Sequence, residues 1–124
     1  MIKNRIDLIT LGCSKNLVDS ERLMGQLAAC GYKMFHDAND VKGEIVIVNT
    51  CGFIGDAKEE SINMILELCN AKKRRKIGKI FVMGDNRRVS LDSRRTEIGL
   101  IDVDNVIGKA QFVAFPFNDF GYLY

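Results

Sequence analysis

The stretch Ile45-Val46-Ile47-Val48-Asn49-Thr50-Cys51 decides the fold. Its first four residues are all apolar and β-branched, without the polar alternation of a strand that is exposed on one face. A short continuous run of this kind is typical of a central strand in a parallel sheet covered on both faces. We therefore expect a buried strand over residues 45–49, with Cys51 just past its end.

Two similar runs predict the neighbouring strands. Residues 6–11 form one, which stops at Gly12, where a residue without Cβ allows a sharp turn. Residues 79–83 form the other, and residues 33–36 are a further candidate strand. We expect the three main strands to be parallel neighbours in one sheet.

Apolar residues at helical spacing predict two helices between these strands. The first runs from about Asn16 to Cys30, and the second begins at the N-cap residue Asp56 and ends near residues 72–76. Cys30 and Cys69 fall on the apolar faces and are expected in the core. The alternation predicts an α/β fold, a three-layer parallel sheet with flanking helices, followed by a short β-rich C-terminal segment.

The composition excludes several classes of protein. The chain has 124 residues, 47% hydrophobic and 27% charged, which excludes disordered and low-complexity proteins, and its net charge of +2 favours neither nucleic acid nor membrane as a partner. No apolar run approaches the roughly 18 residues of a membrane helix, so we expect a cytoplasmic protein. Its four cysteines are then thiols or metal ligands rather than disulfides.

Two further charged features give no specific functional assignment. The five basic residues 72–76 suit either a solvated helix end or a contact with RNA or an acidic partner. His36, the single histidine, has no partner visible in the sequence and is expected at the surface.

Three blocks of the first part of the chain resemble the N-terminal domain of the methylthiotransferases, most closely the RimO type that modifies a ribosomal protein. The blocks are Leu11–Glu21, Val48–Ile54 and Ala57–Ile62. In that family three cysteines at the ends of three parallel strands hold an auxiliary four-iron four-sulfur cluster, and a radical S-adenosylmethionine domain follows. The resemblance implies Cys13 and Cys51 as cofactor-binding residues and a ribosomal protein as partner.

The chain departs from that family at the third ligand. The family places a cysteine directly after a Met-Gly pair like Met83-Gly84, whereas this chain has Asp85. Since each residue follows a predicted strand, we expect Cys13, Cys51 and Asp85 to meet at the carboxyl edge of the sheet. Two thiolates and a carboxylate could bind zinc or ferrous iron, but a four-iron four-sulfur cluster would be absent or labile.

Residues 81–118 resemble a second family, through the C-terminal conserved box of type I signal peptidases. The matching residues are Phe81–Arg87, Ser90, Asp92–Arg94, Val106–Ala110 and Pro116–Asn118. In that family the serine matching Ser90 helps to orient the catalytic lysine, and the residues matching Asp92 and Arg94 brace the active-site strands. Nothing before Phe81 resembles the segments that carry the nucleophile and the lysine. By themselves these residues predict a hydrogen-bonded turn with a local ion pair.

We therefore interpret residues 1–84 as a methylthiotransferase-like α/β region and residues 85–124 as a signal-peptidase-like β segment packed on it, which is not an independent domain. The leading hypothesis is a chimeric or designed domain without a complete active site. One alternative is an iron-sulfur or metal-binding module with incomplete ligands. The other is a fragment of a signal-peptidase-like serine protease.

Overall fold

The computed structural model describes most of the first hundred residues and two short strands beyond them. The described residues are 1–12, 14–51, 55–84, 88, 91–100, 112–113 and 121–122. The elements are β1 (Ile2–Thr10), α1 (Ser14–Ala29), β2 (Lys33–His36), β3 (Gly43–Asn49), α2 (Gly55–Lys73), β4 (Lys79–Met83), β5 (Phe112–Val113) and β6 (Gly121–Tyr122).

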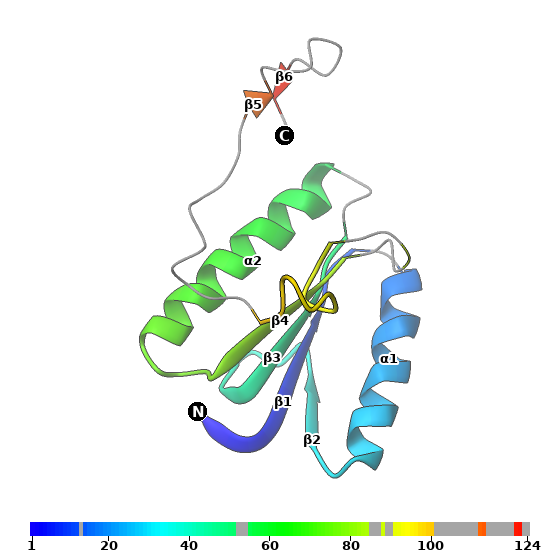
Figure 1. Ribbon diagram of the computed structural model, residues 1–124, viewed down its shortest axis with the longest axis vertical. Helices are drawn as coiled ribbons and strands as arrows, with labels where there is room; N and C mark the ends of the chain where they lie inside the picture. Colours follow the sequence, from blue (N-terminus) through cyan, green and yellow to red (C-terminus); the bar gives the residue numbers. More distant parts are fainter. Residues whose placement is uncertain are drawn as a thin grey trace.

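Four of the strands form one parallel sheet in the order β2-β1-β3-β4, and β5 and β6 pair separately as an antiparallel ribbon. The sheet lies between α1 on one face and α2 on the other (Figure 1). The predicted α/β fold with three parallel neighbours is therefore confirmed, as is the additional strand at Lys33–His36. Among the described helices, none has an apolar stretch long enough to cross a membrane.

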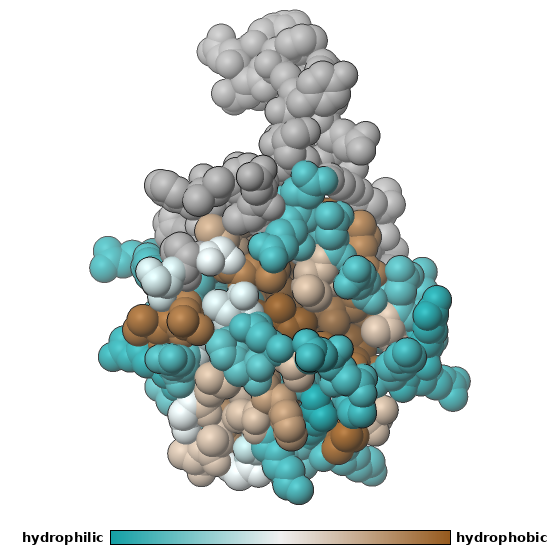
Figure 2. All heavy atoms as spheres, turned by 180° about the vertical axis from the view of Figure 1, so that it is seen from behind, coloured by the Kyte–Doolittle hydropathy of each residue, from teal (hydrophilic) through white to brown (hydrophobic). Residues whose placement is uncertain are grey.

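Alternation along β1 divides the core into two halves. Ile6 and Leu8 point toward α1, whereas Ile9 and Leu11 point toward α2. The β-branched run of β3 divides in the same way, with Ile47 on the first face and Val46 and Val48 on the second. Some apolar side chains remain exposed, among them Leu17, Val18 and Leu91. Figure 2 shows apolar atoms between hydrophilic side chains on one face of the molecule.

The two helix cysteines have different environments. Cys69 is buried against the sheet, as expected, and burial raises the pKa of its thiol. The expectation for Cys30 was wrong, because this residue is exposed. Helix α1 ends at Ala29, one residue earlier than expected, so Cys30 lies in the turn that closes the helix, followed by Gly31 with a φ of 92°.

A buried carboxylate joins β1 to the start of β3. Asp7 is 1% exposed and accepts hydrogen bonds from the Arg5 guanidinium and from the backbone N–H groups of Lys42 and Gly43. Arg5 also lies 3.9 Å from the centre of the Phe35 ring on β2. These contacts compensate for the desolvation of both charges and fix the loop that crosses from β2 to β3.

Replacing Asp7 with asparagine should lower the free energy of unfolding by about 3 kcal/mol, because a buried ion pair that loses one charge leaves the other unpaired. Urea denaturation followed by circular dichroism measures this change. The matched control is Asp40→Asn, which removes an exposed carboxylate paired with Lys42 and should leave the denaturation midpoint almost unchanged. Equal midpoints for the two variants would contradict a stabilising role for the buried pair.

Candidate metal site at the carboxyl edge of the sheet

Backbone hydrogen bonds join the ends of three strands at the carboxyl edge of the sheet. The Leu11 N–H donates to the Asn49 carbonyl across 2.9 Å, which links the exits of β1 and β3. The N–H and the hydroxyl of Thr50 both donate to the Met83 carbonyl, each across 2.9 Å, which links the exits of β3 and β4. The chain segments that lead to residues 13, 51 and 85 therefore begin side by side.

Cys51 lies directly against the turn after β1. The residue is 3% exposed, and its N–H donates to the Ser61 hydroxyl on α2 across 3.4 Å. A Cβ added at Gly12 would lie only 2.2 Å from the Cys51 Cβ and 2.7 Å from its Sγ. Gly12 also has a φ of 93°, which favours glycine. The absence of a side chain at Gly12 is thus what lets the Cys51 thiol approach this turn.

Of the predicted ligands, the structure describes Cys51. Cys13, Asp85 and the signal-peptidase-like Ser90 lie outside the described residues, so their meeting at this edge stays a prediction. Within the described part of the chain, no three histidine, cysteine, aspartate or glutamate side chains form a group that could bind a metal ion. The described cysteines are free thiols.

Asn16, which the sequence analysis missed as a site residue, connects the two cysteine-bearing turns. Its side-chain N–H₂ donates to the carbonyls of Leu11 and Thr50, both across 2.9 Å, and the residue is 2% exposed. These carbonyls come two residues before Cys13 and one residue before Cys51. Both turns are therefore held by the same amide group on the first turn of α1.

Further buried polar groups extend this contact. The Ser20 hydroxyl accepts hydrogen bonds from Thr10 across 2.6 Å and from Asn49 across 3.0 Å. His36 is half-buried rather than at the surface, with its Nε2 at 2.8 Å from the Thr10 hydroxyl and 3.2 Å from the Asp37 carboxylate. Part of this network could be predicted from the sequence, because Asn16 and Ser20 are four residues apart and therefore lie on one helix face.

Asp92 and Arg94 form the turn and local ion pair that their sequence predicted. The Arg94 guanidinium donates to both carboxylate oxygens of Asp92, across 2.8 and 2.6 Å, and Asp92 raises the pKa of Arg94. Asp92 also accepts the Gly84 N–H across 2.6 Å, and Ser93 exchanges two 2.9 Å hydrogen bonds with Val82. This pair therefore fixes the backbone at the outer edge of β4, which is a structural role.

The fold is that of an α/β domain with a parallel sheet. The Cys51 thiol lies at the carboxyl edge of this sheet. The chain belongs to the uncharacterized protein family UPF0004, whose model matches residues 5–103. It is similar to proteins named ribosomal protein uS12 methylthiotransferase RimO. The one from Phocaeicola vulgatus is 60% identical over 102 residues, 82% of this chain and 24% of the relative.

Two further relatives of that name match a longer part of the chain. The protein of Parabacteroides distasonis is 59% identical and that of Porphyromonas gingivalis 64% identical, each over 109 residues, which is 88% of this chain and 25% of the relative. The chain thus spans about a quarter of the length of these relatives. No solved structure matches it.

The close approach of Gly12 to Cys51 gives a test with an internal control. Gly12→Ala should lower the free energy of unfolding by at least about 2 kcal/mol, because alanine at this φ is strained and its Cβ overlaps Cys51. Gly25→Ala should instead raise it by about 0.5–1 kcal/mol, since Gly25 lies within α1 and nothing is within 4 Å of its added Cβ. Thermal denaturation of both variants measures the difference, and equal stabilities would contradict the geometry of this turn.

Proposed function

We propose that the chain is a methylthiotransferase-type N-terminal domain that binds a single metal ion at the carboxyl edge of its sheet and lacks a complete site for a four-iron four-sulfur cluster. The observation that carries this proposal is the Cys51 thiol packed against Gly12, where three hydrogen-bonded strand exits converge. Family membership supports a metal-related role for this edge, because the cysteine pattern of the methylthiotransferases is found at two of its three positions.

The donor set does not fit the cluster. The proposed ligands are Cys13, Cys51 and Asp85, that is, two thiolates and one carboxylate. Iron-sulfur clusters are held by thiolates, and an oxygen donor in place of one thiolate weakens retention of the cluster. The same set suits a single Zn²⁺ or Fe²⁺ ion with water as a fourth ligand.

The partner and the location belong to the same proposal. The relatives are named for the modification of ribosomal protein uS12, so a ribosomal protein is the partner proposed for this chain. A cytoplasmic location agrees with the three free thiols among the described residues, because thiols persist in a reducing compartment. No hydrolytic role is proposed, since Asp92 and Arg94 brace the backbone next to β4.

We further propose that the segment after Gly84 has a separate, signal-peptidase-like origin, which makes the chain chimeric. The support is the replacement of the third ligand by Asp85 and the order of Ser90, Asp92 and Arg94. The family match nevertheless reaches residue 103, as it would in a domain of single origin with a substituted ligand.

A sequence comparison restricted to residues 85–124 distinguishes a chimeric origin from a single origin. The chimeric origin predicts higher identity to signal peptidases than to methylthiotransferases over this segment, because the residues before Gly84 no longer contribute to the match. The opposite order of identities would contradict the chimeric origin and leave the proposed metal site unaffected.

Asp85→Cys should restore the third thiolate of the cluster site. After anaerobic reconstitution with iron and sulfide, we expect this variant to retain several times more iron than the parent chain and to gain visible charge-transfer absorption. Iron per chain after gel filtration and the absorption spectrum are the two measurements.

Two controls distinguish a cluster site from an extra thiol. Thr96→Cys adds a cysteine at an exposed position outside the proposed ligand set and should retain no more iron than the parent. Cys51→Ser should remove Zn²⁺ binding from the parent chain and the gained absorption from the Asp85→Cys variant, whereas Cys30→Ser should change neither. The proposal fails if Asp85→Cys behaves like Thr96→Cys, or if Zn²⁺ binding does not depend on Cys51.

A further inference from the structure

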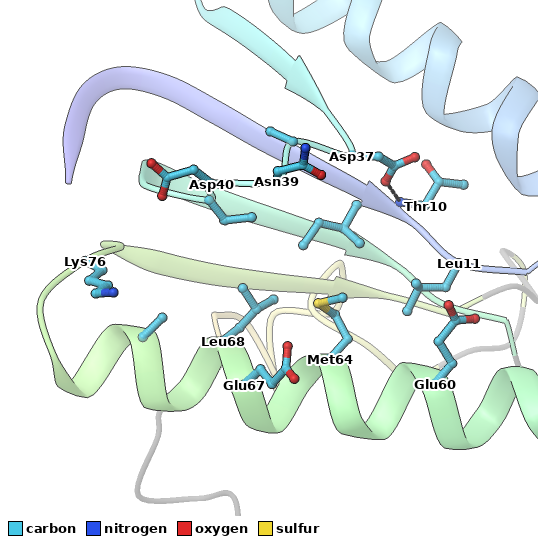
Figure 3. Close-up of a pocket in the computed structure, with 14 residues that line it drawn as sticks. Thr10, Leu11, Asp37, Asn39, Asp40, Glu60, Met64, Glu67, Leu68 and Lys76 are labelled. Carbon is cyan, nitrogen blue, oxygen red and sulfur yellow. Dashed lines mark hydrogen bonds between the residues drawn. The ribbon is translucent and has the colours of Figure 1, made fainter.

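A groove of about 570 Å³ runs along the α2 face of the sheet, between α2 and the loop that follows β2 (Figure 3). Ile9 and Leu11 of β1 form its floor, and Met64 and Leu68 of α2 form one wall. The opposite wall is the loop over residues 37–41. Apolar side chains therefore form the floor and part of one wall of the groove, between polar residues.

Acidic side chains surround this apolar floor. Among the described residues, four carboxylates line the groove, those of Asp37, Asp40, Glu60 and Glu67, against one ammonium group, that of Lys76. Lys42 pairs with Asp40 and holds the pKa of that carboxyl below its usual value. Glu60 and Glu67 are exposed and form no ion pair with any described residue. The described part of the rim therefore has a net negative charge.

The groove has the length of a short peptide. Figure 3 shows Glu60 at the Leu11 end and Lys76 at the other end. The α2 residues that line it run from Glu60 to Ala71, a helical rise of about 16 Å. An extended chain covers that distance with about five residues. The Leu11 end lies next to Gly12, and hence beside Cys51.

We propose that this groove is a docking surface for a cationic amphipathic segment of a partner protein, in which lysine or arginine alternates with aliphatic residues. The aliphatic side chains would bury apolar surface on the partly buried Val41 and Met64, and the basic side chains would reach Glu60 and Glu67 on the rim. Charge complementarity makes this segment a better occupant than an acidic or a purely apolar one.

Fluorescence polarisation with a labelled peptide of about seven alternating lysine and leucine residues tests this proposal on the full chain. The double variant Glu60→Gln and Glu67→Gln should weaken binding about tenfold and reduce its dependence on salt. The matched control, Glu21→Gln with Glu97→Gln, removes the same charge from exposed positions outside the groove and should change binding less than about twofold.

The apolar part of the contact has its own control. Met64→Ala should weaken the lysine-leucine peptide more than a lysine-glycine peptide of equal charge, because the second has no aliphatic side chain to bury. Circular dichroism of each variant verifies that it is folded. Equal binding of the two peptides to the parent chain, or equal loss in both glutamate pairs, would show general electrostatic attraction and overturn the proposal.

A second copy of the chain is the competing occupant, because residues 72–76 are basic. Sedimentation of the chain in the absence of peptide distinguishes a second copy from a partner segment as the occupant of the groove. Self-association that disappears in the Glu60 and Glu67 variant, but not in the control, would assign the groove to another copy and overturn docking of a partner segment.

Discussion

The side-chain amide of Asn16 is the constraint on which the carboxyl edge depends. Two backbone carbonyls, those of Leu11 and Thr50, accept its two N–H groups, and the amide is almost completely shielded from water. A buried amide bound at both hydrogens is expensive to disturb, because each lost bond leaves a polar group without water to replace its partner. The relative position of the two turns is thus set by a helix residue rather than by the strands alone.

Buried polar groups with satisfied hydrogen bonds also join β1 to the start of β3. Asp7 accepts hydrogen bonds from Arg5 on the same strand and from the backbone at the start of β3. Because Gly43 has no side chain, the Asp7 carboxylate can approach its N–H. A Cβ at Gly43 would meet both the Arg5 carbonyl and the Asp7 carboxylate at 2.8 Å. Both ends of the central strand pair are therefore fixed by polar contacts, while apolar packing fills the region between them.

The sheet could be predicted from the sequence because its determinants are local. Apolar runs such as Ile45–Val48 specify buried strands, and the helices between them leave few topologies possible. The polar contacts at the edge could not be predicted in the same way. Asn16 and Asn49 are distant in sequence, and a polar side chain on a helix gives no indication of whether it faces water or two carbonyls. The exposure of Cys30 was missed because this residue lies in the turn after α1 rather than on the apolar face of the helix.

An exposed and a buried thiol, Cys30 and Cys51, lie at opposite edges of the four-stranded sheet. Helix α1 runs back from the carboxyl edge, so Cys30 follows it at the amino edge, where the Asn4 side chain at the start of β1 donates to the Gly31 carbonyl. Cys51 is enclosed at the other edge. Among the described thiols, a maleimide dye would consequently label Cys30 first, which provides a spectroscopic handle far from the exit of β3 without any engineered cysteine.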